Sequence, residues 1–439
     1  MIKVITYGTY DMLHYGHIKL LERAKALGDY LIVGVTSDSF DRVRGKINVK
    51  QSLQERIDAV RATGIADEII IEEYEGQKID DIRRYDIDIF TVGSDWIGYF
   101  DYLNEYCKVI YLERTKGVSS SELRAEERQL CIGVVGNSNS ELEKFASESG
   151  FVNGVKIVAV HSDSIGNLSE ALKDQFVYLD DYEKLLDVVD AVYLVSHPAK
   201  HYQQIKAALS KGKHVLCESP VAISSKEVKE LLEVAKANNC ILMESLKTAY
   251  SLAFSRLQLI VKSGYIGDVV SVDATCTSLK KSDGDKRGSL YSWGPFGLLA
   301  VFSILGTNYQ DKLIQSRINE NGYDTFTKIS FGYEQAVASV KVANGAKSEG
   351  ELVITGTKGY IYVPAPWWKT DYYEVRYEDS RQNKRYFYRL EGEGIRYTIV
   401  SFLKAITNGK TETYIPEQVT LAIADIMNDF NNRVDTNIL

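Results

Sequence analysis

The sequence predicts a multidomain α/β protein: two Rossmann-like parallel sheets in succession, then an α+β domain with a large, mostly antiparallel sheet. Over roughly the first 250 residues, short apolar strands alternate with amphipathic helical segments, which is typical of parallel sheets. Beyond Val269 the pattern changes to closely spaced alternating strands. A chain of 439 residues has room for two or three domains. We expect domains at 1–128, 129–250 and 251–439.

The first apolar strand, around Val4 and Ile5, ends in a turn that carries two histidines. His14 and His17 flank Gly16, and helical spacing of apolar residues follows. A helix N-terminus attracts anions, a glycine lets the backbone approach them, and imidazole donors can follow charge onto a phosphorus centre. The pattern therefore predicts a phosphate site. The alternative is that one histidine only caps the helix.

A second basic segment follows the predicted strand Lys108–Leu112. It runs Arg114-Thr-Lys-Gly-Val-Ser-Ser-Ser121 and opens a charged helical stretch through Gln129. A cation, a glycine bend and three hydroxyls at a helix start are typical of a phosphate cradle. A single serine there would be an ordinary N-cap.

With these segments in view, residues 1 to about 126 resemble the glycerol-3-phosphate cytidylyltransferase family of the nucleotidyltransferase superfamily. The resemblance rests on Gly8–Asp11, His14–His17, Ile18–Lys25, Lys46, Glu55-Arg56, Gly93–Trp96 and Arg114–Ser120. It implies CTP as donor, Mg²⁺ as cofactor, and a small polyol phosphate as acceptor, with a CDP-alcohol such as CDP-glycerol formed for cell-surface polymer synthesis. It does not imply metal ligands among the protein side chains.

The resemblance also implies roles for individual residues. The catalytic residues would be His14, His17, Lys46 and Arg114. Nucleotide and phosphate contacts would come from Thr9, Tyr10, Gly16, Asp95, Trp96, Thr115, Ser119 and Ser120, and acceptor contacts from Asp11 and Arg56. The alternatives are core packing for Trp96 and a solvated helix face for Arg56.

Composition narrows the other classes of function. A formal net charge of −8 argues against nonspecific binding to nucleic acid. The five cysteines are scattered and lack metal-ligand spacing, so they indicate reduced thiols in a cytoplasmic protein. No apolar run reaches membrane-spanning length, and no membrane association is expected.

The second predicted sheet begins with Leu130–Val135 and an incomplete dinucleotide-binding fingerprint. Ser138 stands where the second glycine of that fingerprint would let a pyrophosphate approach. A carboxylate after the next strand, Asp163, is a candidate for binding a ribose. The full candidate set for NAD(P), by pattern and by the resemblance given next, is Gly133, Gly136, Asn137, Ser138, Asp163, His197 and Glu218.

Residues from about 130 onward resemble the family of NAD(P)-dependent oxidoreductases that includes glucose–fructose oxidoreductase and inositol 2-dehydrogenase. The matching stretches are Ser196–Pro198 with His201, Ala208–Pro220 and Glu351–Gly359. Ser219 replaces the family lysine that assists hydride and proton transfer, and Gly294–Gly306 lacks the family's ionisable residues. Lys247 is a possible substitute, although an exposed helix lysine is the simpler interpretation.

Three interpretations of the second half follow. It reduces a keto-phosphate with NAD(P)H to make the acceptor, it binds a ligand without catalysis, or it is an assembly module. Tyrosines in the last sheet, and the association of related oxidoreductases through it, favour a homo-oligomer. The expected elements are strands at Tyr30–Thr36, Val155–His161, Ala191–Ser196, His214–Glu218, Thr325–Gly332, Ala336–Ala343, Glu351–Thr355 and Tyr373–Tyr377, and helices at Ile395–Ile406 and Glu417–Phe430.

Overall fold

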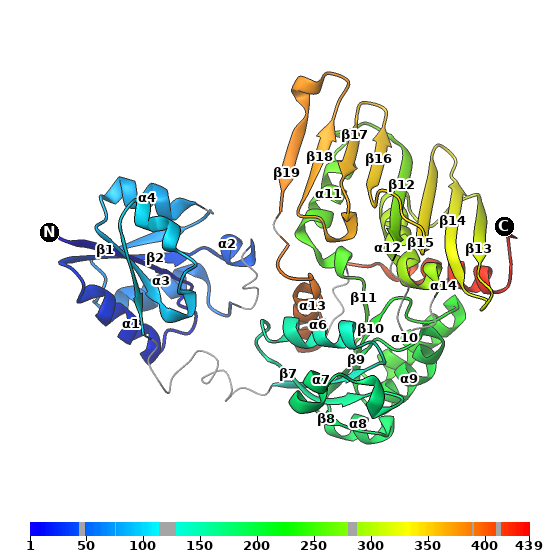
Figure 1. Ribbon diagram of the computed structural model, residues 1–439, viewed down its shortest axis with the longest axis horizontal. Coiled ribbons are helices and arrows are strands. Elements are labelled where there is room, and N and C mark those ends of the chain that lie inside the picture. The colour runs from blue at the N-terminus through cyan, green and yellow to red at the C-terminus, as the bar shows by residue number, and fades with distance from the viewer. Residues whose placement is uncertain (44–48, 75, 114–128, 280–287, 389, 410–413) are drawn as a thin grey trace. The chain divides into compact units, whose positions relative to one another are not determined.

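The computed structural model describes residues 1–43, 49–74, 76–113, 129–279, 288–388, 390–409 and 414–439 (Figure 1). The chain divides into two compact units. The first holds Met1–Gln129 with Val152–Gly154, and the second holds Leu130–Phe151 with Val155–Leu439. The candidate residues Lys46, Arg114, Thr115, Ser119 and Ser120, and the charged stretch that precedes Gln129, lie outside the described residues.

The first unit is built on a parallel sheet with the strand order β3-β2-β1-β4-β5. The order reverses direction between β1 and β4, and ligands bind at the carboxyl ends of strands beside such a point. The strands are β1 (Lys3–Gly8), β2 (Tyr30–Thr36), β3 (Glu68–Glu72), β4 (Ile89–Gly93) and β5 (Lys108–Leu112). The helices are α1 (Tyr15–Lys25), α2 (Asp38–Val43), α3 (Leu53–Ala62) and α4 (Gln77–Tyr85), with short 3₁₀ turns η1 (Ser94–Trp96) and η2 (Asp101–Glu105).

Both faces of this sheet are covered. Val4 packs with Leu21 of α1 in one apolar cluster, while its neighbour Ile5 packs with Phe90 and Phe100 in another. Successive residues of a strand point to opposite faces, so β1 is a central strand buried on both sides. The turn that carries the histidines follows the carboxyl end of this strand.

The second unit begins with another parallel sheet, of order β11-β10-β9-β6-β7-β8. Its direction reverses between β6 and β9. The strands are β6 (Leu130–Val135), β7 (Val155–His161), β8 (Val177–Tyr178), β9 (Ala191–Leu194), β10 (His214–Glu218) and β11 (Leu242–Ser245). The helices are α6 (Asn139–Ser149), α7 (Glu170–Gln175), α8 (Tyr182–Val188), α9 (Pro198–Ser210) and α10 (Ser225–Ala237), with η3 (Ile165–Asn167) and η4 (Lys247–Tyr250).

The rest of the second unit surrounds a sheet of order β19-β18-β17-β16-β12-β15-β14-β13-β20 in the described residues (Figure 1). Helix α12 packs against β12 and β15. The strands are β12 (Val269–Ser278), β13 (Asp311–Ile318), β14 (Asp324–Gly332), β15 (Val337–Asn344), β16 (Leu352–Gly356), β17 (Tyr360–Val363), β18 (Tyr372–Arg376), β19 (Lys384–Phe387) and β20 (Thr436–Ile438). The other elements are α11 (Leu252–Lys262), α12 (Ser289–Leu305), η5 (Trp367–Lys369), η6 (Ser380–Gln382), α13 (Ile395–Asn408) and α14 (Glu417–Asn431).

The expected fold class is confirmed, with one refinement. The large sheet is mixed, because β12 pairs with β15 and β13 with β20 in parallel while the other pairs are antiparallel. A parallel pair needs a long crossover, and α12, β13 and β14 supply it between β12 and β15. In the described part of the chain, no helix combines the length and apolar character required to cross a membrane.

Candidate functional site

The paired histidines lie at the start of α1, directly after β1. His14 is the N-cap, and its Nδ1 accepts a hydrogen bond of 3.0 Å from the Gly16 N–H. Because Nδ1 accepts, a neutral His14 ring carries its proton on Nε2 and donates from that atom. The His14 and His17 rings stack with centroids 3.9 Å apart and an angle of 24° between their planes. The structure thus combines two imidazoles with a helix N-terminus, and the capping alternative is also correct for His14.

The turn that leads to the histidines is held in an uncommon conformation. Tyr10 and Met12 have φ angles of +51° and +49°, which cost non-glycine residues roughly 1 kcal/mol or more each. The buried Asp11 carboxylate accepts the backbone N–H groups of Lys50 and Gln51 at 3.0–3.2 Å. The Gln51 side chain accepts the Met12 N–H at 2.7 Å. These bonds fix the loop against the segment that precedes α3.

Arg56 is the centre of the polar network beside this turn. Its side chain is 0% exposed, so the solvated-face alternative is wrong. Nη1 donates to the Thr9 and Thr36 carbonyls at 2.7 and 2.8 Å. The guanidinium also forms ion pairs with Asp38 and, at 3.3 Å, with Asp41.

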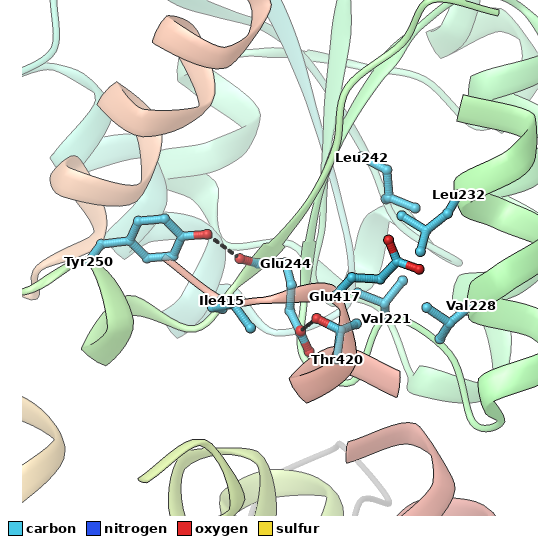
Figure 2. Close-up of a pocket in the computed structure, with 9 residues that line it drawn as sticks. All are labelled: Val221, Val228, Leu232, Leu242, Glu244, Tyr250, Ile415, Glu417 and Thr420. Atoms are coloured by element: carbon cyan, nitrogen blue, oxygen red, sulfur yellow. Dashed lines mark hydrogen bonds between the residues drawn. The ribbon is translucent and has the colours of Figure 1, made fainter. Parts of the chain in front are cut away.

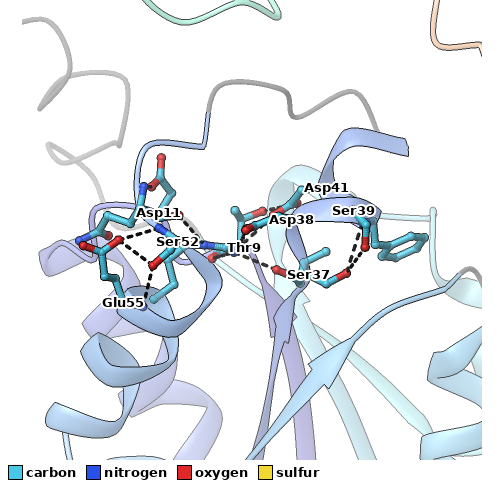
Figure 3. A network of polar contacts seen from close by, with 12 residues as sticks. Thr9, Asp11, Ser37, Asp38, Ser39, Asp41, Ser52 and Glu55 are labelled. Atoms are coloured by element: carbon cyan, nitrogen blue, oxygen red, sulfur yellow. Dashed lines mark hydrogen bonds and ion pairs between the residues drawn. The ribbon is translucent and has the colours of Figure 1, made fainter. Parts of the chain in front are cut away.

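Asp41 extends this network to the side chain of Thr9. Its Oδ1 accepts the Thr9 hydroxyl at 2.8 Å (Figure 3). The ends of β1 and β2 and the helix α2 are therefore tied together by Arg56 and Asp41. Neither carboxylate had been singled out from the sequence; a buried arginine on α3 requires such partners, but sequence spacing does not reveal them.

A small cavity of about 60 Å³ opens at the carboxyl ends of β1 and β4. It is lined by Tyr7, Gly8, Thr9, Lys78, Phe90, Val92, Trp96 and Phe100. Trp96 contacts the rings of Tyr99 and Phe100 at 5.4 and 5.8 Å, so it both packs and faces the cavity. Lys78 is buried and forms an ion pair with Glu72. Asp95 lies on η1 next to Trp96.

In the second unit, the turn after β6 keeps the first glycine of the dinucleotide-binding fingerprint, and other residues replace the second and third glycines. A Cβ on Gly136 would lie 2.6 Å from Val195 Cγ1, so the close approach of the strands requires glycine there. Gly133 is likewise enclosed, by Leu185. Ser138 is the N-cap of α6, but its side chain does not cap the helix. Glu141, in the first turn of α6, stands at the third glycine position, a departure that the sequence could have shown.

The ends of β6 and β7 are joined by polar contacts. Asn137 donates to Asp163 Oδ2 at 2.7 Å and accepts the Asp163 N–H at 3.1 Å. Lys200 forms an ion pair with Asp163 at 2.7 Å, and this contact lowers the pKa of the carboxyl. His197 caps α9 by accepting the Ala199 N–H at 3.2 Å. Asp163 is thus held as a carboxylate just beyond the end of β7.

Glu218 ends β10 and is hydrogen-bonded to both neighbouring strands. Its Oε1 accepts the hydroxyls of Tyr193 and Ser245, each at 2.7 Å. Desolvation raises the pKa of Glu218 to about 7. The next residue, Ser219, donates its hydroxyl to the buried Glu244. Ser219, which stands at the position of the family's lysine, is therefore hydrogen-bonded to the carboxyl group of Glu244.

Lys247 is not the exposed helix lysine expected from the sequence. It lies on η4, just after β11, and its side chain is 19% exposed. Burial and the charge of Lys369 lower its pKa, and its Nζ lies 3.2 Å from Glu393 Oε2. Its acidic partner lies 146 residues away in the chain, so local spacing gave no signal of the pair.

Two family models match, each over part of the chain: "Cytidylyltransferase-like" over residues 5–126, and "Oxidoreductase family, NAD-binding Rossmann fold" over residues 128–246. The glycerol-3-phosphate cytidylyltransferase of Bacillus spizizenii is 49% identical over 130 residues, covering 30% of this chain and 100% of that protein. The scyllo-inositol 2-dehydrogenase (NADP⁺) of Bacillus subtilis is 34% identical over 257 residues, covering 54% and 77%. The chain belongs to both families.

The cytidylyltransferase domain and the oxidoreductase-like domain are thus fused in one chain, and the first is a nucleotidyltransferase. The glycerol-3-phosphate cytidylyltransferase of Staphylococcus aureus is 45% identical over 126 residues, covering 29% of this chain and 95% of that protein. A crystal structure of a 3-ketoreductase from Actinomadura kijaniata, in complex with NADP and TDP-benzene, shares the fold of the second unit. It has a TM-score of 0.64 and 18% identity, with 71% of this chain and 99% of that chain covered. For the second half, the matches favour neither reduction of a keto-phosphate nor a non-catalytic binding or assembly role.

The oxidoreductase-like domain also holds a larger cavity, of about 240 Å³ (Figure 2). Its apolar lining comes from Val221, Val228, Leu232, Leu242 and Ile415. Glu244, which accepts the Thr420 hydroxyl at 2.6 Å, and Glu417 of α14 supply carboxylates. Desolvation raises the pKa of Glu244. This cavity lies between α10, β11 and α14, and none of the predicted site residues lines it.

Proposed function

We propose that the cytidylyltransferase domain transfers CMP from CTP to the phosphate of a small polyol phosphate such as glycerol phosphate. Pyrophosphate leaves, and a CDP-alcohol suited to cell-surface polymer synthesis is formed. The stacked pair of His14 and His17 at the N-terminus of α1 is the observation that carries this proposal. The relatives that match along nearly their whole length support it.

The chemistry requires positioning and charge stabilisation. A phosphate oxygen of the acceptor attacks the α-phosphorus of CTP, the new P–O bond forms, and the bond to the bridging oxygen of pyrophosphate breaks. His14, donating from Nε2, and His17 would stabilise the negative charge that develops on these oxygens. In the proposal Lys46, Arg114, Thr115, Ser119 and Ser120 bind the triphosphate, as the family pattern implies, and Tyr10 and Gly16 shape the turn.

Mg²⁺ fits this arrangement as an ion held mainly by the triphosphate. Among the described residues there is no group of three or more histidine, cysteine, aspartate or glutamate side chains suited to a metal. Magnesium commonly uses substrate phosphates with one or two carboxylates. When bound, it would neutralise phosphate charge. Asp11 is already engaged by two backbone N–H groups, which favours a structural task for that carboxylate.

The acceptor would occupy the cavity of about 60 Å³ beside the histidine turn. Thr9 and Lys78 line it with polar groups, and Trp96 provides an apolar wall. Asp95, adjacent on η1, belongs to the same part of the site. Asp11 and Arg56 are buried and engaged by the protein, so we assign them to positioning the turn.

A pyrophosphate-release screen tests the proposal. Each nucleoside triphosphate is paired with a panel of alcohol phosphates of three to five carbons, with Mg²⁺ present. We expect release with CTP and a small polyol phosphate, and none without the acceptor. If no pair releases pyrophosphate, or if another nucleotide is preferred over CTP, the proposal is wrong.

We further infer that the oxidoreductase-like domain binds NAD(P) at the carboxyl ends of β6 and β7. Gly136 allows the tight turn in which β6 passes close to Val195, and α6 begins without a side-chain cap. Asn137 and Lys200 hold the Asp163 carboxylate for ribose hydroxyls. Gly133, Ser138, His197 and Glu218 complete the proposed site, in which the cofactor would supply hydride chemistry.

Dinucleotide binding is tested by calorimetry with NADH. We expect Asp163→Ala to weaken binding roughly tenfold, the loss of a hydrogen bond to a charged group. The matched control is Asp187→Ala, since Asp187 lies near the end of α8, away from the carboxyl ends of β6 and β7, and is 65% exposed. Equal affinities for the wild type and D163A, or no binding to the wild type, would contradict the assignment.

We also propose that the chain works in the cytoplasm, where CTP is available, as a homo-oligomer. The aromatic pairs on β18 and β19, such as Tyr372 with Phe387 at 5.5 Å, support association through the large sheet. Phe387 is 67% exposed. Sedimentation of the wild type and of Phe387→Ser tests this assembly; a monomeric wild type would contradict it.

A further inference from the structure

Two lysines of the oxidoreductase-like domain share one carboxylate. Glu393 forms ion pairs with Lys369, on η5, and with Lys247, on η4, through the same oxygen, Oε2. Although burial alone would raise the pKa of Glu393, the hydrogen bond from Lys369 and the charge of Lys247 lower it to about 2. The three side chains come from segments far apart in the sequence, so the fold has brought them together.

The segments that carry these side chains are joined by other bonds. The Thr248 hydroxyl donates to the Trp368 carbonyl at 2.8 Å, which ties η4 to η5 next to the two lysines. The Glu393 N–H donates to Glu148 at 3.4 Å, and Arg396 binds the same carboxylate through two nitrogens at 2.9 and 3.0 Å. These hydrogen bonds and the Arg396–Glu148 ion pair therefore fix the segments that place the Lys247 and Lys369 ammonium groups next to each other.

The charges of this cluster do not balance. Among the described residues, the ammonium groups of Lys247 and Lys369 contact one carboxylate, which leaves an excess of one positive charge around the mostly buried Lys247. Glu218 is the next carboxyl group to act on Lys247, but its raised pKa of about 7 leaves it only partly ionised near neutral pH. A structural ion pair needs only one cation for each carboxylate, and a surplus buried cation is costly. The surplus indicates an anionic ligand.

The place of the cluster in the sheet identifies which ligand it would contact. Lys247 follows β11, and Ser245 at the end of β11 bonds Glu218 at the end of β10. Strand β11 lies three places from β6 and four from β7, so at about 4.8 Å per strand the cluster lies roughly 14–19 Å from where the pyrophosphate and the adenosine ribose would bind. A dinucleotide phosphate cannot reach it. The substrate side of the nicotinamide is nearer.

We propose that Lys247 and Lys369, positioned by Glu393, form a subsite for the phosphate group of a small phosphorylated keto or polyol compound. This inference rests on the NAD(P) site proposed above, with the pyrophosphate at β6 and the adenosine ribose at β7. The ligand belongs to the class of alcohol phosphate that the cytidylyltransferase domain consumes, which gives the fusion a chemical reason. The cation that the family places at position 219 is here supplied from position 247, since Ser219 is bonded to Glu244.

The test is calorimetric binding of dihydroxyacetone phosphate to the full chain, with and without NAD⁺. CDP-glycerol is first added to saturation so that the acceptor site of the cytidylyltransferase domain is filled. We expect binding to the wild type, no measurable binding of uncharged dihydroxyacetone, and affinity weakened roughly tenfold or more in Lys247→Met/Lys369→Met. The Lys247→Arg/Lys369→Arg variant keeps the charge and should retain most of the affinity.

The matched control replaces two exposed lysines of α10, Lys226 and Lys229, by methionine, and should bind as the wild type does. Thermal unfolding checks that each variant is folded. The proposal is overturned if dihydroxyacetone phosphate fails to bind the saturated wild type, if the uncharged analogue binds equally well, or if the methionine pair leaves the affinity unchanged. Pyrophosphate release judges the cytidylyltransferase proposal separately, so the two can fail independently.

Discussion

The two parallel sheets of this chain each end a central strand in a turn that opens a helix, but the two turns are built differently. After β1, His14 caps α1 with its own ring and stacks on His17. After β6, Ser138 leaves α6 without a side-chain cap, and Glu141 occupies its first turn. The first turn has its donors on neighbouring residues, whereas the second depends on groups from β7, β10 and η4. A site made of neighbours appears as one motif in the sequence, whereas a contact such as that of Lys247 with Glu393 does not.

The largest effect we expect is on the framework of the first turn. Arg56→Met would leave Asp41 buried without its guanidinium and release the Thr9 and Thr36 carbonyls. Breaking one side of a buried ion pair costs about 3–5 kcal/mol. Urea unfolding of the wild type and R56M measures this loss in the cytidylyltransferase domain.

The matched control is Arg61→Met on the same helix, because Arg61 is 62% exposed and pairs with Asp58 at the surface. That variant should unfold close to the wild type. Should R56M be as stable as R61M, the network in Figure 3 does not hold the turn, and the contrast between the two sites loses its structural basis.

The next effect concerns the dispersed site and its dependence on pH. Glu218 has a folded pKa of about 7 against an ordinary value of 4.5, so the folded state binds the proton more tightly than the unfolded state. Its contribution to stability is full below pH 4.5 and is lost as the pH rises through 7. The wild type should therefore lose up to about 3 kcal/mol of unfolding free energy over this pH range, and Glu218→Gln should not show that loss.

Unfolding free energies of the wild type and E218Q at pH 5 and pH 8 measure the effect. We expect E218Q to gain relative to the wild type on going from pH 5 to pH 8. A difference between the two proteins that is the same at both pH values would show that the Glu218 carboxyl is not desolvated in solution.

The smallest effect concerns the start of α3, the helix that carries Arg56. Ser52 accepts the Glu55 N–H and donates its own N–H to the Glu55 carboxylate, a reciprocal cap. Ser52→Ala should cost about 1 kcal/mol of stability and leave turnover nearly unchanged, because Arg56 keeps its partners. A large loss of turnover in S52A would mean that the cap, and not the arginine, positions the turn.

Much of the fold could be predicted because apolar periodicity reports which faces are buried. The strand β5 was expected at Lys108–Leu112 and β7 at Val155–His161, and the structure has both with those bounds. The helix α13 was expected from Ile395 and begins there. The parallel pairing of β12 with β15 was not predicted, because alternation gives no information on strand direction.

Some polar contacts could be predicted from the sequence and others could not. His14 and His17 could be paired from the sequence because one turn of chain joins them. For Arg56 the resemblance implied an acceptor contact and the helix pattern left a solvated face as the alternative, but neither revealed its ion pairs with Asp38 and Asp41. Lys247 was misjudged for the same reason, since its partner Glu393 is distant in the chain. A charge can be assigned to the interior only when its partners are known.

The most direct test of the central claim is pyrophosphate release from CTP and glycerol 3-phosphate by His17→Ala. Removing one donor to the developing negative charge should lower turnover by about 10²–10³-fold. R61A, with a change on the exposed face of α3, should turn over as the wild type does, and all three proteins should unfold at similar temperatures. A folded H17A that keeps wild-type turnover would contradict the assignment of the histidine pair to catalysis.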